Sequence, residues 1–124
     1  MQISYVVEDI EREMQRWTQE LGVGPFFYLP HFPVEDAMHR GSPSHADIDV
    51  ALAFNGSMCF ELIRQNNHAP SVFRELIDSR GYGFHHWAVS TRDFDAELQT
   101  VLHRHFNDEH LNHDLRRRLI VRRR

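Results

Sequence analysis

The chain has 124 residues, of which 41% are hydrophobic, and this length suits a single domain with a substantial core. No apolar run approaches the roughly 20 residues that a membrane-spanning helix needs, so the composition argues against a membrane protein. The single cysteine, Cys59, cannot form an internal disulfide. A lone thiol and the lack of a signal-peptide pattern after Met1 lead us to expect a cytoplasmic protein.

The formal net charge of −4 is distributed unevenly along the chain. Residues 1–98 contain 7 Arg and 15 Asp or Glu, a balance of −8, whereas residues 99–124 contain 7 Arg and 3 acidic residues, a balance of +4. This change of sign indicates that the end of the chain is a different kind of segment.

The first elements predicted are a strand, a helix and a second strand. Residues 3–7 are β-branched and aromatic, as in a strand, and Asp9 is placed to cap the helix that follows. Hydrophobic residues three and four positions apart give that helix one apolar face, and Gly22 ends it. The residues of this face are Ile10, Met14, Trp17 and Leu21. A short strand is predicted at residues 25–29 and a proline-rich loop at residues 30–44.

A β-hairpin is the clearest feature of the middle of the chain. Hydrophobic residues alternate with polar or small ones over residues 48–54 and again over 58–63, and Asn55-Gly56 between them favours a tight turn. We expect the large apolar side chains of both strands to share the face that packs on the first helix. These side chains are Ile48, Val50, Leu52, Phe54, Phe60 and Leu62.

The chain then repeats its opening pattern. After a short helix at residues 72–77, residues 84–89 predict a strand, and a helix begins at Asp93. This order of strand, capping aspartate and helix matches residues 5–11 at a constant offset of 84. Residues 103–124 contain no glycine or proline and predict a basic helix or a disordered tail.

We therefore predict an α+β fold, made of one βαβββ unit and the βα start of a second. The first unit covers residues 1–67, and a linker with a short helix covers residues 68–82. The incomplete second unit covers residues 83–102 and is followed by the tail at 103–124. No strands are predicted that would complete the second unit.

Three residues are candidates for a metal site. The offset places Gln2 and His86 at equivalent positions of the repeated strands, and Glu61 lies between apolar residues in the hairpin. A carboxylate is costly to bury unless it is paired or bound to a metal. Imidazole nitrogen with carboxylate or amide oxygen suits a divalent cation such as Zn, Ni, Co, Mn or Fe. Each residue also has a plainer interpretation, in which Glu61 points to solvent, His86 is a structural histidine and Gln2 lies in a frayed terminus.

The tail carries weaker signals. His110 and His113 would share a helical face, but a solvated segment rich in histidine is the favoured interpretation. The arginine clusters at residues 116–118 and 122–124 could contact nucleic acid or an anionic membrane, but we expect neither as a partner.

Three segments carry a family resemblance, namely QISYVVED at residues 2–9, CFELI at 59–63 and GFHHWAV at 83–89. They resemble the signature strands of the glyoxalase/bleomycin-resistance/dioxygenase superfamily, also called the vicinal-oxygen-chelate superfamily. The last segment is especially similar to methylmalonyl-CoA epimerase-like members. The resemblance extends over residues 2–98.

The resemblance implies a half-open cup of paired βαβββ modules around one divalent metal ion. By position it implies that the metal ligands are Gln2, Glu61 and His86, and that Glu61 is also the catalytic residue. The fourth ligand of the family, a glutamate on the last strand of the second module, has no counterpart in this chain. Gln2 favours isomerase- or lyase-like members over the extradiol dioxygenases, in which two histidines and a glutamate bind iron.

The implied function is that of a metal-dependent epimerase- or lyase-like protein that abstracts a proton next to the carbonyl or thioester of a small molecule. In such chemistry the metal polarises the substrate oxygen and stabilises an enediolate, while a carboxylate moves the proton. The alternative is a small-molecule-binding protein of the same fold without catalysis, or a truncated one. Because the second unit is incomplete, we expect a homodimer in which one copy completes the other.

Overall fold

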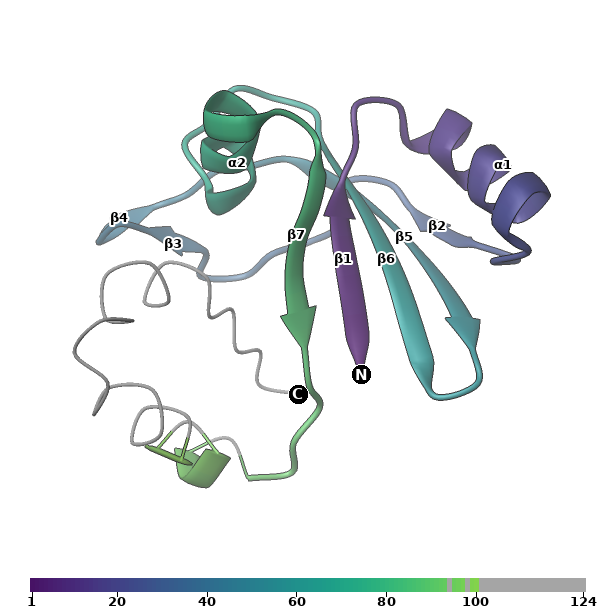
Figure 1. Cartoon of the computed structure of the whole chain (residues 1–124). Coiled ribbons are helices and arrows are strands. Elements are labelled where there is room, and N and C mark those ends of the chain that lie inside the picture. Colours follow the sequence, from purple (N-terminus) through teal and green to yellow (C-terminus); the bar gives the residue numbers. More distant parts are fainter. Residues whose placement is uncertain (94, 98, 101–124) are drawn as a thin grey trace. The chain divides into compact units, whose positions relative to one another are not determined.

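The computed structural model describes residues 1–93, 95–97 and 99–100 (Figure 1). The chain divides into two compact units, Met1–Trp87 and Ala88–Arg124. The tail predicted at residues 103–124 lies outside the described residues. Within the described part of the chain, no helix is long and apolar enough to cross a membrane.

The first unit is built on a five-stranded mixed sheet. Its elements are β1 Gln2–Val6, α1 Ile10–Leu21, β2 Phe27–Leu29, β5 Ile48–Asn55, β6 Met58–Gln65, α2 Val72–Arg80 and β7 Gly83–Ala88. The strand order is β2-β5-β6-β1-β7. Strand β1 is parallel to β6, β5 is antiparallel to β2 and β6, and β7 runs opposite to β1 (Figure 1). This arrangement confirms the predicted α+β fold.

Aspartate caps begin both helices of the sequence repeat. The Asp9 carboxylate accepts a hydrogen bond from Arg12 N at 3.0 Å at the start of α1. At the offset of 84, the Asp93 carboxylate accepts one from Ala96 N, also at 3.0 Å. Helix α1 ends at Gly22, whose φ of 66° lies in the left-handed region that glycine adopts without strain.

The two strands of the hairpin bury their large side chains on opposite faces, so the prediction of one shared face is wrong. Strands β5 and β6 are joined by a two-residue turn, which places Leu52 opposite Glu61 and Ala51 opposite Leu62. Residues directly opposite each other in a sheet share a face. Even-numbered positions of β5 therefore share a face with odd-numbered positions of β6. Phe54, at the end of β5, is exposed.

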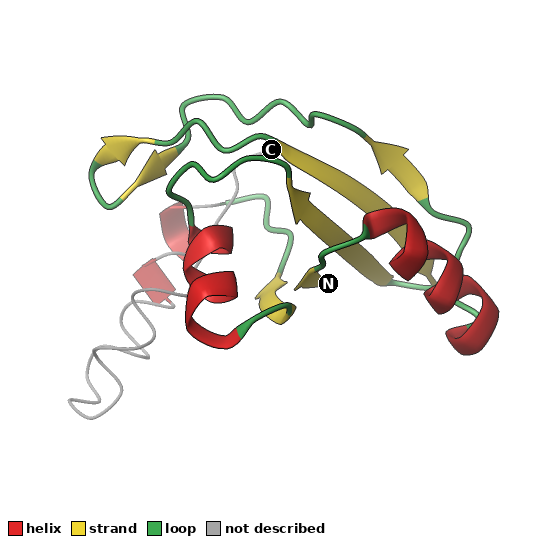
Figure 2. Ribbon diagram, turned by 90° about the horizontal axis from the view of Figure 1, so that it is seen from above, coloured by secondary structure: helices red, strands yellow, loops and turns green. Residues whose placement is uncertain are grey.

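A hydrophobic cluster lies on each face of the sheet. The cluster under α1 contains Val7, Ile10, Ala51 and Leu62. The cluster under α2 contains Val6, Ile48, Val50, Ile63, Phe73 and Leu76. The helices cover opposite faces and lie well apart (Figure 2). The interior strands β5 and β6 therefore bury side chains on both faces, whereas the edge strand β2 is exposed.

The apolar face of α1 is less buried than its sequence predicts. Trp17 is half-buried, and its ring packs edge-on against Tyr5 and Phe60, with centroid distances of 5.1 and 5.8 Å. Leu21, in the last turn, is exposed. Helix α1 therefore contacts the sheet from Ile10 to Trp17, and its last turn extends beyond this contact.

The segment predicted as a loop at residues 30–44 contains a small hairpin. Its strands are β3 Met38–His39 and β4 Ser42–Pro43. His39 Nε2 lies 3.1 Å from a carboxylate oxygen of Glu75 in α2, and the Arg40 guanidinium contacts the same oxygen. These contacts hold the tip of the segment against α2.

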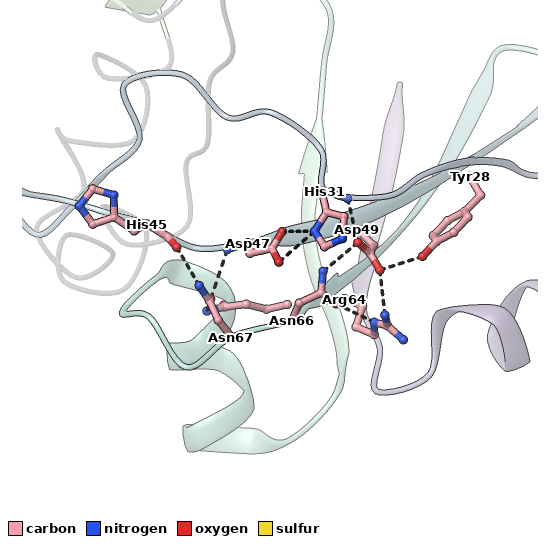
Figure 3. Close-up of polar contacts among 9 residues, drawn as sticks. Tyr28, His31, His45, Asp47, Asp49, Arg64, Asn66 and Asn67 are labelled. Atoms are coloured by element: carbon pink, nitrogen blue, oxygen red, sulfur yellow. Dashed lines mark hydrogen bonds and ion pairs between the residues drawn. The ribbon is translucent and has the colours of Figure 1, made fainter.

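Asp49 forms the polar centre that joins the start of this segment to the sheet (Figure 3). Its side chain is only 2% exposed. It accepts hydrogen bonds from the Tyr28 hydroxyl at 2.8 Å, His31 N at 2.9 Å, Asn66 Nδ2 at 2.8 Å and the Arg64 guanidinium at 2.9 Å. Burial acts to raise the pKa of Asp49, but the hydrogen bonds and the charge of Arg64 outweigh it, so the pKa lies below its ordinary value.

This network predicts a specific pH dependence of stability. Because the folded-state pKa of Asp49 is lowered, its contribution to the free energy of unfolding is present above the unfolded value of 3.8 and is lost as the pH falls through the folded value. We expect Asp49→Asn to lower the free energy of unfolding at neutral pH by about 2–3 kcal/mol, since a hydrogen bond to a charged group contributes about 1.5–3 kcal/mol. The variant should also lose stability less steeply than the wild type as the pH falls below about 5.

Urea unfolding at a series of pH values measures both effects. Asp78→Asn, at an exposed position of α2, is the control and should keep the wild-type profile. An Asp49→Asn variant with the wild-type pH profile would show that this carboxylate does not control acid stability.

Candidate metal centre

The candidate ligands come from three adjacent strands, with β1 in the middle. In the parallel pairing of β1 with β6, Gln2 lies opposite Cys59 and Ser4 lies opposite Glu61. Opposed residues share a face, so Gln2, Ser4 and Glu61 all lie on the face away from α1. The register therefore brings two of the three candidate ligands, Gln2 and Glu61, to one face of the sheet.

Glu61 and His86 come together across β1. The distance from Glu61 Oε2 to His86 Nε2 is 3.8 Å, and the side chains are 2% and 3% exposed. This distance is longer than a hydrogen bond. It is close to the separation of about 3.4 Å that two ligands of one tetrahedral Zn²⁺ would have. The pair therefore suits either an ion pair with a protonated histidine or two ligands of a shared cation.

Gln2 lies beside this pair and not at its centre. It is half-buried, two residues before Ser4, and therefore about 7 Å along the strand from the level of Glu61. Among the described residues, no three His, Cys, Asp or Glu side chains are grouped so that they could hold a metal ion. A third ligand from this part of the chain would thus be of another type, such as the Gln2 amide.

His85 is linked to both His86 and α2. Its Nδ1 lies 2.8 Å from Nδ1 of His86, and its Nε2 lies 3.3 Å from the carbonyl oxygen of Val72. Its ring packs on Phe73 with a centroid distance of 5.0 Å. Burial lowers the pKa of His85 below its ordinary value, although the hydrogen bond to Val72 acts in the opposite direction. The neutral ring is therefore its ordinary form near neutral pH.

The two histidines share one face of the sheet, contrary to the usual alternation of a strand. His85 meets Phe73 of the α2 cluster, and His86 meets Glu61 on the same side. Phe84 packs instead on Tyr5 of the α1 side, at a centroid distance of 5.9 Å. A local irregularity in β7, as in a β-bulge, therefore brings two consecutive imidazoles together.

Ser4 belongs to this site, although its sequence context gives little reason to single it out. It is fully buried, and within the described residues its hydroxyl has no hydrogen-bond partner. Because Ser4 lies directly opposite Glu61 on the strand between β6 and β7, its small side chain allows Glu61 and His86 to meet above it. The strand register is the signal that identifies it.

Substitutions at Ser4 test this packing. We expect Ser4→Ala to leave the free energy of unfolding unchanged or slightly higher, because removing an unpartnered buried hydroxyl costs little. Ser4→Leu should lower it by about 1–3 kcal/mol through overpacking. Urea unfolding measures both variants. A loss of more than about 1 kcal/mol in Ser4→Ala would mean that the hydroxyl has a stabilising partner.

Comparisons with known proteins identify the family and similar folds. The sequence model described as the Glyoxalase/Bleomycin resistance protein/Dioxygenase superfamily matches residues 1–110. A hypothetical protein from Bacillus halodurans C-125 is similar in structure, with a TM-score of 0.63 and 18% identity over 83% of this chain and 65% of that one. No curated protein sequence matches the chain significantly.

Two methylmalonyl-CoA epimerase structures are also similar. The enzyme from Mycobacterium tuberculosis gives a TM-score of 0.57 and 18% identity over 83% of this chain and 61% of that one. A variant of the Streptomyces coelicolor enzyme in complex with 2-nitronate-propionyl-CoA gives a TM-score of 0.59 and 16% identity over 83% and 69%. The chain spans less than two thirds of the Bacillus and Mycobacterium proteins, and at these identities the similarity concerns the fold.

Proposed function

The chain belongs to the glyoxalase/bleomycin resistance protein/dioxygenase superfamily, and from this premise we propose that it binds one divalent metal ion and acts on the carbonyl or thioester of a small molecule. The observation that supports the proposal best is the approach of Glu61 Oε2 and His86 Nε2 to 3.8 Å. A buried carboxylate and imidazole at this separation suit a shared cation.

The proposed ligands are Gln2, Glu61 and His86. Together they offer an amide oxygen, a carboxylate and an imidazole, a donor set that suits Zn, Ni, Co, Mn or Fe. All three belong to adjacent strands of one sheet, which gives them a rigid support.

The proposed reaction is proton abstraction from the carbon next to the substrate carbonyl. When bound, a divalent ion would polarise that carbonyl and make the neighbouring C–H bond more acidic. The Glu61 carboxylate would accept the proton, and the C–H electron pair would move to the substrate oxygen.

A return of the proton to the opposite side of the carbon would complete an epimerase reaction. The resemblance assigns this step to a glutamate of the second module. The second candidate function is that of a protein that binds a small molecule without converting it. Similar structures are described with methylmalonyl-CoA and with 2-nitronate-propionyl-CoA, so acyl-CoA thioesters are the first ligands to test.

Metal content tests the proposed site. We expect the dialysed wild type to retain one divalent ion per chain, measured by elemental analysis. Glu61→Gln and His86→Asn should weaken metal binding by more than the roughly 10–100-fold that loss of an outer hydrogen-bond partner costs. Glu20→Gln and His68→Asn change the same residue types at exposed positions and should bind like the wild type. A wild type that binds no divalent ion contradicts the proposal.

The same proteins can then be assayed for proton exchange. In D₂O the metal-loaded wild type should introduce deuterium next to the thioester of methylmalonyl-CoA, and Glu61→Gln should not. Tight binding of the thioester without exchange would favour the non-catalytic alternative.

We also propose that the protein is a homodimer that pairs through β7. This strand lies at one edge of the sheet, and Trp87 on it is 55% exposed, with Phe84 also exposed. An edge strand with exposed aromatic residues favours association with another chain. In a two-fold dimer the partner could supply a further ligand to the metal site.

Light scattering at micromolar concentration should therefore give twice the chain mass of 14.7 kDa. Trp87→Glu should give a folded monomer. Phe27→Glu, at a similarly exposed position on the opposite edge strand β2, should remain dimeric. A monomeric wild type, or a dimer broken equally by both substitutions, contradicts the proposed interface.

A further inference from the structure

We propose that His85 is a positioning residue that determines which ring nitrogen of His86 carries the hydrogen, through hydrogen bonds that start at the carbonyl of Val72. The inference rests on the proposed function for its purpose, since it explains how Nε2 of His86 is offered to a metal ion shared with Glu61. The family resemblance assigns a ligand role to His86 but no role to His85 or Val72.

The first step is the contact between His85 and α2. A backbone carbonyl can only accept a hydrogen bond. His85 Nε2, which lies 3.3 Å from the Val72 oxygen, must therefore carry the hydrogen. A neutral imidazole has one N–H and one acceptor nitrogen, so Nδ1 of His85 becomes the acceptor.

In the second step, the tautomer of His85 determines the tautomer of His86. The two Nδ1 atoms lie 2.8 Å apart, a separation that requires one hydrogen between them. Since Nδ1 of His85 carries none, Nδ1 of His86 donates. Neutral His86 then has its lone pair on Nε2.

The third step is the approach to Glu61. The lone pair of His86 Nε2 and the carboxylate oxygen of Glu61 face each other at 3.8 Å, and two electron-rich groups at this distance favour a cation between them. In the other tautomer, Nε2 would point its hydrogen at Glu61 and compete with a metal ion. Hydrogen-bond partners of this kind commonly set the tautomer of a ligating histidine.

The irregularity of β7 agrees with this pairing of the two histidines. A regular strand would send His85 and His86 to opposite faces and would separate their rings. Here both lie on the α2 side, and the ring of Phe73 packs on His85 with a centroid distance of 5.0 Å. The irregularity of β7 thus lies at His85-His86, where it brings the two Nδ1 atoms within hydrogen-bonding distance.

Two variants separate a hydrogen-bonding role from a packing role. His85→Phe keeps a ring against Phe73 but removes the acceptor. His85→Asn loses the ring but places an amide oxygen near the position of Nδ1. A residue that acts only through packing would tolerate Phe better than Asn, and an acceptor would show the opposite order.

Nitrogen NMR of the metal-free full chain above about pH 8, where unperturbed histidines are neutral, reads the tautomer directly. The His86 signals are assigned by their loss in His86→Asn. We expect hydrogen on Nδ1 of His86 in the wild type and in His85→Asn, and a shift toward Nε2 in His85→Phe. Hydrogen on Nε2 in the wild type overturns the inference.

Zinc affinity, measured by competition with a chromophoric chelator, gives the second readout. We expect His85→Phe to bind Zn²⁺ about 10–100-fold more weakly than the wild type and His85→Asn to stay closer to it. Equal affinities for the two variants overturn the inference.

If the wild type binds no zinc, the proposed function fails, while the tautomer of His86 still decides the role of His85. If His85→Phe does not fold, as thermal melting would show, the wild-type and His85→Asn spectra decide it.

Discussion

The register of the sheet is the constraint on which the site depends. Strands β5 and β6 turn through two residues, of which Gly56 comes first with a φ of 59°, as in the tight turns that glycine favours. Strand β1 then pairs in parallel so that Ser4 lies opposite Glu61. A shift of the β5–β6 pairing by one residue would move Glu61 to the face of α1, among the apolar residues around Ile10. A shift of the β1–β6 pairing would move Gln2 and Ser4 to the face opposite Glu61. The position of one carboxylate thus follows from a turn several residues away.

Helix α2 contributes to the site as well as to the core. Its residues Phe73 and Leu76 complete the hydrophobic cluster on the face away from α1, and its first carbonyl, from Val72, meets His85. Hydrophobic packing and the orientation of the imidazoles therefore share one element. A substitution that displaces α2 would therefore disturb both the hydrophobic cluster and the hydrogen bond between Val72 and His85.

Local signals in the sequence predicted the helices and most strands, whereas the repeat related only Gln2 to His86 and the family resemblance joined Glu61 to them. The sequence could not assign faces, because apolar residues alternate equally well in β5 and β6 and only their pairing decides which residues are neighbours. The position of Asp49 was also beyond reach of the pattern. Its alternation with apolar residues predicts a side chain exposed to solvent, whereas the Asp49 carboxylate is buried and accepts hydrogen bonds from four donors. The orientation of His85 depends on α2, and no pattern within residues 83–89 contains that information.

The segment between β2 and β5 is fixed at its two sides and open between them. Asp49 holds it at His31, and Glu75 holds it at the β3–β4 hairpin, while residues 33–36 between these points are exposed. Exposed stretches whose backbone makes no contact with the core are where chains accept inserted sequence. This stretch is therefore a natural point for attaching a fluorescent reporter or an affinity tag, on a part of the surface that neither the sheet nor the histidine pair requires.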